Sequence, residues 1–220
     1  MEREVRVGVL ASGRGSNLEA LWRAEQAGTL GARLVAVASD HRTAPALQLA
    51  ARFGLPALAV DAGPRRGRMT AVAEAEIVAF LRAQRVDLVC LAGFMRLLGT
   101  PLLEAYPGAI LNIHPSLLPS FPGLEAQARA LEHGVKVAGC SVHFVDAGVD
   151  TGPIVAQATV PVHEDDTPET LAARILEQEH RLYPYAVRLW AEGRLQVRDR
   201  RVFIREPSLG SSGRSREERS

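Results

Sequence analysis

The sequence has few cysteines and almost no lysine. Cys90 and Cys140 are the only cysteines in 220 residues, and Lys136 is the only lysine among 26 basic residues. Neither cysteine belongs to a CxxC motif or to a Cys/His spacing that binds zinc, so we expect no metal site. Both lie in apolar, strand-like surroundings, which predicts buried free thiols and a reducing, cytoplasmic location.

The sequence also lacks net charge and long apolar runs. Its 26 basic and 25 acidic residues leave a formal charge of +1, which gives no electrostatic reason to bind nucleic acid or an anionic membrane. No apolar run approaches the roughly 20 residues that span a bilayer, and no secretory signal precedes the first strand. We therefore expect small-molecule partners, without nucleic acid or a membrane.

Short β-rich runs alternate with longer helical patterns through the first half of the chain. Continuous apolar strands between helices are typical of a parallel sheet that is covered on both faces. This pattern predicts a Rossmann-like α/β fold, with a mostly parallel central sheet and helices on both faces. The predicted strands are 5–10, 34–38, 57–60, 86–91 and 109–113, and the predicted helices are 18–26, 45–53 and 69–84.

The pattern changes in the C-terminal half, where we expect mixed strands. Residues 138–145 alternate polar and apolar side chains, and 154–162 form another predicted strand. Thr167 and Pro168 suit the N-cap and the first turn of a helix that runs to about Trp190.

The last part of the chain is predicted to hold a hairpin and a tail. Residues 195–204 favour a hairpin, and the polar stretch 206–220 is typical of a disordered tail. We expect residues 1–205 to form a single domain.

A glycine-rich loop, S-G-R-G-S-N at residues 12–17, separates the first predicted strand from the first helix. N–H groups at a helix N-terminus lack internal partners, so such a loop favours a bound phosphate. One alternative is a plain turn with Ser16 or Asn17 as N-cap. Another is a dinucleotide fingerprint with Asp40 as the ribose-binding acid, but its third glycine would stand where Leu18 is found.

The fifth predicted strand ends in N-I-H-P-S-L-L-P, residues 112–119. Asn112 and His114 point to the same side of an extended strand, because side-chain direction repeats every two residues. Ligands of open parallel sheets gather beyond this end of the strands. A lone histidine is often structural, but an amide and a protonated imidazole side by side can both donate to one oxygen. That pairing suits an oxyanion formed at a carbonyl.

A histidine that stays protonated near pH 7 needs a nearby carboxylate. Asp150, in the glycine-containing loop 146–153, is the best candidate, although an aspartate in such a loop is equally well a turn residue. No serine or cysteine stands at a nucleophile elbow, so a covalent acyl-enzyme is not indicated. The residues alone predict group transfer at a carbonyl, with a phosphate-bearing substrate.

Five segments together resemble one family, the folate-dependent phosphoribosylglycinamide (GAR) formyltransferases of the 10-formyltetrahydrofolate-using superfamily. The Asn-x-His motif with its distant Asp marks the superfamily, and Gly-Arg-Gly-Ser-Asn marks the GAR branch. The resemblance implies formyl transfer from 10-formyltetrahydrofolate, as co-substrate, to the GAR amine in de novo purine biosynthesis, without a metal. It extends over about 5–195, and the segments are 12–17, 91–96, 112–119, 141–145 and 150–153.

The resemblance also implies a role for particular residues. The N-terminal half would bind the ribotide phosphate, and the C-terminal half would bind folate and carry the catalytic group. The implied catalytic residues are Asn112, His114 and Asp150. The implied GAR-binding residues are Gly15, Ser16, Asn17 and Glu179, and the implied folate-binding residues are Arg68, Met95, Arg96, Leu97, Leu98 and Asn112.

Three of these assignments have alternatives. Glu179 also fits an ordinary exposed helix carboxylate, and Leu97 with Leu98 also fits simple helix packing. Arg68 competes with its neighbours Arg65 and Arg66 for the folate contact.

The sequence departs from the family pattern at Glu125 and Gln127, where histidines are common, so we expect different chemistry around the catalytic group. A 10-formyltetrahydrofolate hydrolase is the main rival, since water would replace the amine. A methionyl-tRNA formyltransferase would need a further domain and a basic surface, and a nucleotide-binding module would not explain Asn112, His114 and Asp150.

We expect a monomer or a weak homodimer.

Overall fold

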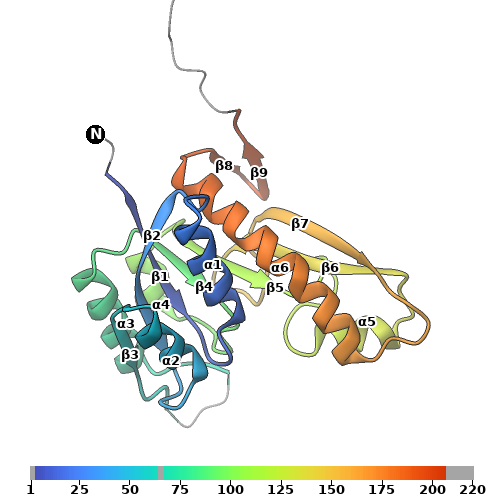
Figure 1. Ribbon diagram of the computed structural model, residues 1–220, viewed down its shortest axis with the longest axis horizontal. Coiled ribbons are helices and arrows are strands. Elements are labelled where there is room, and N and C mark those ends of the chain that lie inside the picture. Colours follow the sequence, from blue (N-terminus) through green and yellow to red (C-terminus); the bar gives the residue numbers. More distant parts are fainter. Residues whose placement is uncertain (1–2, 64–66, 207–220) are drawn as a thin grey trace, which may run out of the picture.

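The computed structural model describes residues 3–63 and 67–206. The strands of this part form one 9-stranded sheet in the order β3-β2-β1-β4-β5-β6-β7-β9-β8 (Figure 1). The strands are β1 Val5–Leu10, β2 Ala32–Ser39, β3 Ala57–Ala59, β4 Leu88–Leu91, β5 Ile110–His114, β6 Val137–Phe144, β7 Ile154–Pro161, β8 Leu195–Arg198 and β9 Arg201–Ile204. The helices are α1 Ser16–Gln26, α2 Pro45–Arg52, α3 Ala71–Ala83, α4 Thr100–Ala105, α5 Ala126–Glu132 and α6 Pro168–Ala191.

The predicted mostly parallel sheet with mixed C-terminal strands is confirmed. Strands β3, β2, β1, β4 and β5 run parallel to one another, whereas β6 pairs antiparallel with both β5 and β7. The predicted hairpin is β8–β9, and it joins the sheet through a single register pair, Ile154 with Arg201.

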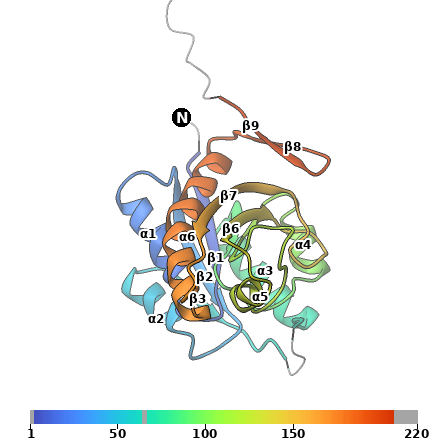
Figure 2. The same cartoon turned by 90° about the vertical axis from the view of Figure 1, so that its right-hand side faces the viewer.

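Helices cover both faces of the sheet. Apolar side chains of α1, α2 and α6 pack with one side of the strands, and those of α3 and α4 pack with the other. Figure 2 shows α1 and α6 on one side of the strands and α3 and α4 on the other. Both predicted free cysteines are buried between these layers, and burial raises the pKa of each thiol to about 12.

Helix α6 begins as the sequence predicts. The Thr167 hydroxyl accepts from the Thr170 N–H, the Thr170 hydroxyl accepts from the Thr167 N–H, and Pro168 stands in the first turn. These contacts satisfy backbone donors that a helix start leaves without partners. Further along, the buried Tyr183 hydroxyl lies within hydrogen-bond distance of backbone carbonyls of both β4 and β5, which share its one hydrogen.

Two short helices, α4 and α5, were not predicted. Helix α4 is capped from outside, because Glu74 of α3 accepts from the Gly99 N–H at 2.6 Å. Helix α5 follows its N-cap, Glu125, whose φ of 58° is left-handed. Leu97 and Leu98 precede α4 and lie outside any helix. Leu98 is nevertheless buried in the same core cluster as side chains of α3 and α4, so the packing interpretation holds for Leu98 but not for the exposed Leu97.

The predicted tail, 206–220, lies outside the described residues apart from Glu206. Within the described ranges, no helix is both long enough and apolar enough to cross a membrane.

Candidate active site

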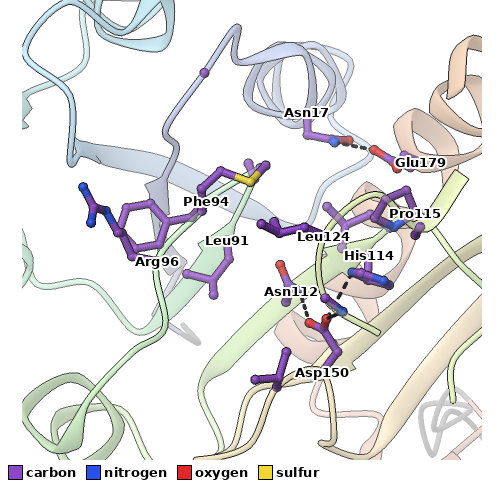
Figure 3. A pocket seen from close by; sticks show the side chains of 18 of the residues that line it. Asn17, Leu91, Phe94, Arg96, Asn112, His114, Pro115, Leu124, Asp150 and Glu179 are labelled. Atoms are coloured by element: carbon purple, nitrogen blue, oxygen red, sulfur yellow. Dashed lines mark hydrogen bonds and ion pairs between the residues drawn. The ribbon is translucent and has the colours of Figure 1, made fainter. Parts of the chain in front are cut away.

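A cleft of about 1120 Å³ opens beyond the carboxyl ends of the parallel strands. Its walls come from the loops after β1, β4 and β6, from the end of β5, from the start of α5 and from α6 (Figure 3). Of the predicted site residues, only Arg68 does not line the cleft. Its backbone forms a β-bridge with Leu97, which does line the cleft. Arg65 and Arg66 lie outside the described residues. The residues that the structure brings together around the cleft are Gly15, Ser16, Asn17, Met95, Arg96, Leu97, Leu98, Asn112, His114, Asp150 and Glu179.

The glycine-rich loop leads directly into α1 at one end of the cleft. Gly15 is the N-cap, with a left-handed φ of 80°, and no side chain caps the helix. The interpretation of Ser16 or Asn17 as N-cap is therefore wrong. A Cβ atom at Gly15 would approach the Ala46 and Leu49 side chains to 3.0 Å, so close packing requires glycine here. The first N–H groups of α1 thus face the cleft without a side-chain partner, which suits an anion.

Asp40 does not serve as a ribose-binding acid. It is buried, and its carboxylate accepts from Arg96 Nε at 2.8 Å. It also lies outside the cleft wall, so the dinucleotide alternative is wrong. The pair fixes Arg96, whose side chain does line the cleft.

Asn17 and Glu179 meet across the same end of the cleft. Asn17 Nδ2 donates to Glu179 Oε2 at 2.7 Å (Figure 3). Glu179 is only 7% exposed, so the alternative of an exposed helix carboxylate is wrong. Burial raises the pKa of this carboxyl, and the bond from Asn17 opposes the rise. Asn17 Oδ1 is buried and has no partner within the described part of the chain, which leaves an acceptor for a ligand donor.

Asn112 and His114 point to the same side of β5, as predicted, and both reach Asp150 (Figure 3). Asn112 Nδ2 donates to Asp150 Oδ1 at 3.3 Å, and His114 Nδ1 lies 3.3 Å from Asp150 Oδ2. The turn is instead held by Asp146, which accepts from the Gly148 N–H and the Thr151 hydroxyl. Asp150 is therefore more than a turn residue, because its carboxylate is aimed into the cleft.

Both ring nitrogens of His114 face acceptors. Nε2 lies 3.0 Å from the Phe121 carbonyl oxygen, opposite the bond from Nδ1 to Asp150. Only the imidazolium satisfies both, since a neutral ring carries one N–H. The pKa of His114 is nevertheless lowered, because burial outweighs the Asp150 charge and the Phe121 carbonyl, both of which act to raise it. For Asp150, burial acts to raise the pKa, but hydrogen bonds from His143 and Gly123 and the charge of His114 outweigh it, so the pKa is lowered.

His143 completes this network and was not predicted as a site residue. Its Nδ1 lies 2.8 Å from the Phe144 carbonyl oxygen and must donate to it. Nε2 is then free to accept from Asn112 Nδ2 at 3.1 Å, and it lies 3.5 Å from Asp150 Oδ1. The signal in the sequence was the polar face of an otherwise apolar strand, on which His143 stands two residues after Ser141.

Apolar side chains surround the opposite end of the cleft. Leu91 and Leu98 are buried in its wall, and four exposed residues form its rim: Met95, Leu97, Leu124 and Val149. Exposed apolar groups gathered at one cleft are typical of a binding site for a flat, largely apolar ligand. Across the described ranges, no group of three or more His, Cys, Asp or Glu side chains is arranged to hold a metal ion.

Comparison with known proteins gives one consistent family. A formyl transferase family model matches residues 5–187. A phosphoribosylglycinamide formyltransferase of Bacillus subtilis is 44% identical over 180 residues, which are 82% of this chain and 91% of that protein. The trifunctional purine biosynthetic protein adenosine-3 of Drosophila melanogaster is 46% identical over 194 residues, but the chain spans only 14% of its length.

Solved structures agree with this result. A glycinamide ribonucleotide transformylase 1 from Symbiobacterium toebii is 54% identical with a TM-score of 0.89, and the match covers 94% of this chain and 96% of that one. A formyltetrahydrofolate deformylase from Pseudomonas syringae is 27% identical with a TM-score of 0.86, and the match covers 93% of this chain and 67% of that one.

Proposed function

Because the chain belongs to the formyl transferase family, we propose that it is a phosphoribosylglycinamide formyltransferase. It transfers the formyl group of 10-formyltetrahydrofolate to the amine of 5'-phosphoribosylglycinamide, a step of de novo purine biosynthesis. The observation that carries the proposal is the network of Asn112, His114 and Asp150 in the same cleft as the glycine-rich loop.

The ribotide binds at the α1 end of the cleft. Its phosphate lies against the N–H groups of Gly15, Ser16 and Asn17, where the helix dipole favours negative charge. Glu179 and the unpartnered Asn17 Oδ1 face the same space, so they accept from ribose hydroxyls or from the glycinamide end.

The folate binds at the apolar end. Met95, Leu97 and Leu98 supply surface for its rings, Asn112 lies at the inner end of this surface, and Arg96 stands at the rim, held by Asp40. We keep Arg68 as a peripheral contact, because its bridge to Leu97 places its backbone beside the cleft wall.

In the reaction the glycinamide amine attacks the formyl carbon. A nitrogen–carbon bond forms, the bond from that carbon to folate N10 breaks, and one proton moves from the amine to N10. Asn112 and His114 donate to the formyl oxygen as it becomes an oxyanion. Their bonds to Asp150 are long for charge-assisted bonds, so both donors can turn to the substrate at small cost. Asp150 keeps His114 protonated and relays the proton through water.

Residues 1–205 act as one formyltransferase domain in this proposal, with the ribotide phosphate bound by the N-terminal half and folate by the C-terminal half. Its two buried free cysteines are consistent with a reducing cytoplasm. We propose a monomer or a weak homodimer.

An absorbance assay with 10-formyltetrahydrofolate, with and without the ribotide, tests the function. Turnover that requires the ribotide identifies the transferase. The deformylase likeness makes hydrolysis the second candidate, and equal turnover without the ribotide would select it. A matched variant, Asp166→Asn, removes an ion-paired carboxylate at the start of α6, outside the cleft wall, and leaves either activity in place.

A further inference from the structure

Phe121, whose carbonyl oxygen lies 3.0 Å from His114 Nε2, has an unusual backbone conformation. Its φ is 53°, in the left-handed region that a bulky side chain rarely adopts. Such a conformation is strained and persists only where its surroundings hold it. Neighbouring side chains must therefore hold the backbone at Phe121 and Pro122 in this conformation.

Helix α5 supplies that hold through Arg129. Arg129 Nη1 donates to the Pro122 carbonyl oxygen at 2.6 Å, and its guanidinium carbon lies 5.8 Å from the centre of the Phe121 ring. The His133 ring packs edge-on against Phe121 from the same helix end, with ring centres 5.2 Å apart. One planar cation thus contacts both the ring of the strained residue and the carbonyl that follows it. A guanidinium suits both contacts, whereas an ammonium has no flat face to stack.

We infer that Arg129 is a positioning residue, which holds the Phe121 carbonyl on His114 Nε2 and so directs the Nδ1–H toward Asp150 and the reacting centre. The inference rests on the proposed function only for the role of His114 in the reaction.

The charge of Arg129 and the carbonyl that Arg129 holds act on the pKa of His114 in opposite directions. The charged or titratable groups around His114 are Asp150 from the loop after β6, His143 from β6 and Arg129 from α5. The positive charge of Arg129 acts weakly to lower the pKa of His114, while the carbonyl that it positions acts to raise it. Removing Arg129 therefore moves the His114 pKa upward if only charge matters, and downward if positioning matters.

The experiment is an NMR titration of His114 in the ligand-free protein, as wild type, Arg129→Met and Arg129→Lys. We expect the pKa to fall by about one unit in both variants, because a hydrogen bond to the charged ring is lost. The Nε2–H signal should weaken through faster exchange with water. In the formyl-transfer assay, kcat near neutral pH should fall about tenfold, since one unit changes the imidazolium fraction tenfold, while the ribotide KM stays constant.

Arg198→Met is the matched control, because it also removes an arginine that stacks on a phenylalanine. The guanidinium carbon of Arg198 lies 5.3 Å from the centre of the Phe203 ring, on the distant β8–β9 hairpin. A higher His114 pKa in Arg129→Met with no change in Arg129→Lys would overturn the inference in favour of charge alone. An unchanged pKa in both would also overturn it. If Arg129→Met does not fold, Arg129→Lys decides the question. The titration needs no substrate, so its failure counts against Arg129, whereas a wild type without formyl transfer counts against the proposed function.

Discussion

Replacing Asp150 with asparagine keeps the shape of the side chain and removes its charge from the centre of the site. His114 Nδ1 and Asp150 Oδ2 are 3.3 Å apart, and opposite charges at that separation attract by about 5 kcal/mol at an effective dielectric constant of about 20. That figure is an upper limit, and a nearby carboxylate usually shifts a pKa by about 1–3 units. Burial already lowers the His114 pKa and Asp150 is the strongest opposing influence, so the variant pKa should fall by about 1–3 units.

The consequence for activity follows from the fraction of imidazolium. At a pH above both pKa values, each unit lost reduces that fraction tenfold, so transfer near neutral pH should fall roughly 10- to 1000-fold. The imidazolium is regained as the pH falls through the lowered pKa, so the remaining activity should rise toward the acid side. It falls again where the substrate amine becomes protonated.

Two measurements test this prediction: the NMR titration of His114 and the pH–rate profile of formyl transfer. Asp166→Asn is the control, since it also removes an ion-paired carboxylate but leaves the cleft intact. A wild-type His114 pKa in Asp150→Asn together with near-normal turnover would refute the reasoning.

Three further variants test other parts of the structure. His114→Ala should lower turnover by about 10²–10³ while calorimetry shows ribotide binding nearly unchanged, and retention of more than about a tenth of the activity would contradict its role. Ser16→Asp should weaken ribotide binding and leave folate binding unchanged, because it places a carboxylate beside the phosphate; equal losses in the two titrations would indicate misfolding instead. Tyr183→Phe should lower the free energy of unfolding by about 1–3 kcal/mol, because the carbonyls of Leu91 and Leu111 lose the one buried O–H that they share; an unchanged denaturation midpoint would show that this donor does not matter.

Much of the fold could be predicted from local patterns. The parallel strands are continuous apolar runs, and α6 begins with Thr167 and Pro168, so each signal lies within a few neighbouring residues. Helix α4 escaped prediction because its cap is Glu74, which is distant in sequence. Helix α5 was not predicted because it is short, and because its N-cap, Glu125, has a left-handed backbone and makes no side-chain cap.

The candidate site also has a part that local patterns predict and a part that depends on how distant elements pack. The spacing of Asn112 and His114 on one strand fixes their common direction, and the structure bears this out. The contact between Asn17 and Glu179 depends on how α1 and α6 pack, which no local pattern encodes. His143 was missed because a single histidine on a buried strand gives no sign of what faces it.

The distance along the chain between Asn17 and Glu179 also sets an order of events during synthesis. The two residues are 162 positions apart, so at about 5–20 residues per second the ribosome makes the second roughly 8–30 s after the first. Throughout that interval the nascent chain carries the whole glycine-rich loop without the carboxylate that faces it. A chain interrupted before α6 would keep every loop donor and still lack one wall of the cleft. This end of the cleft is therefore complete only after translation has passed α6 and that helix has docked against α1.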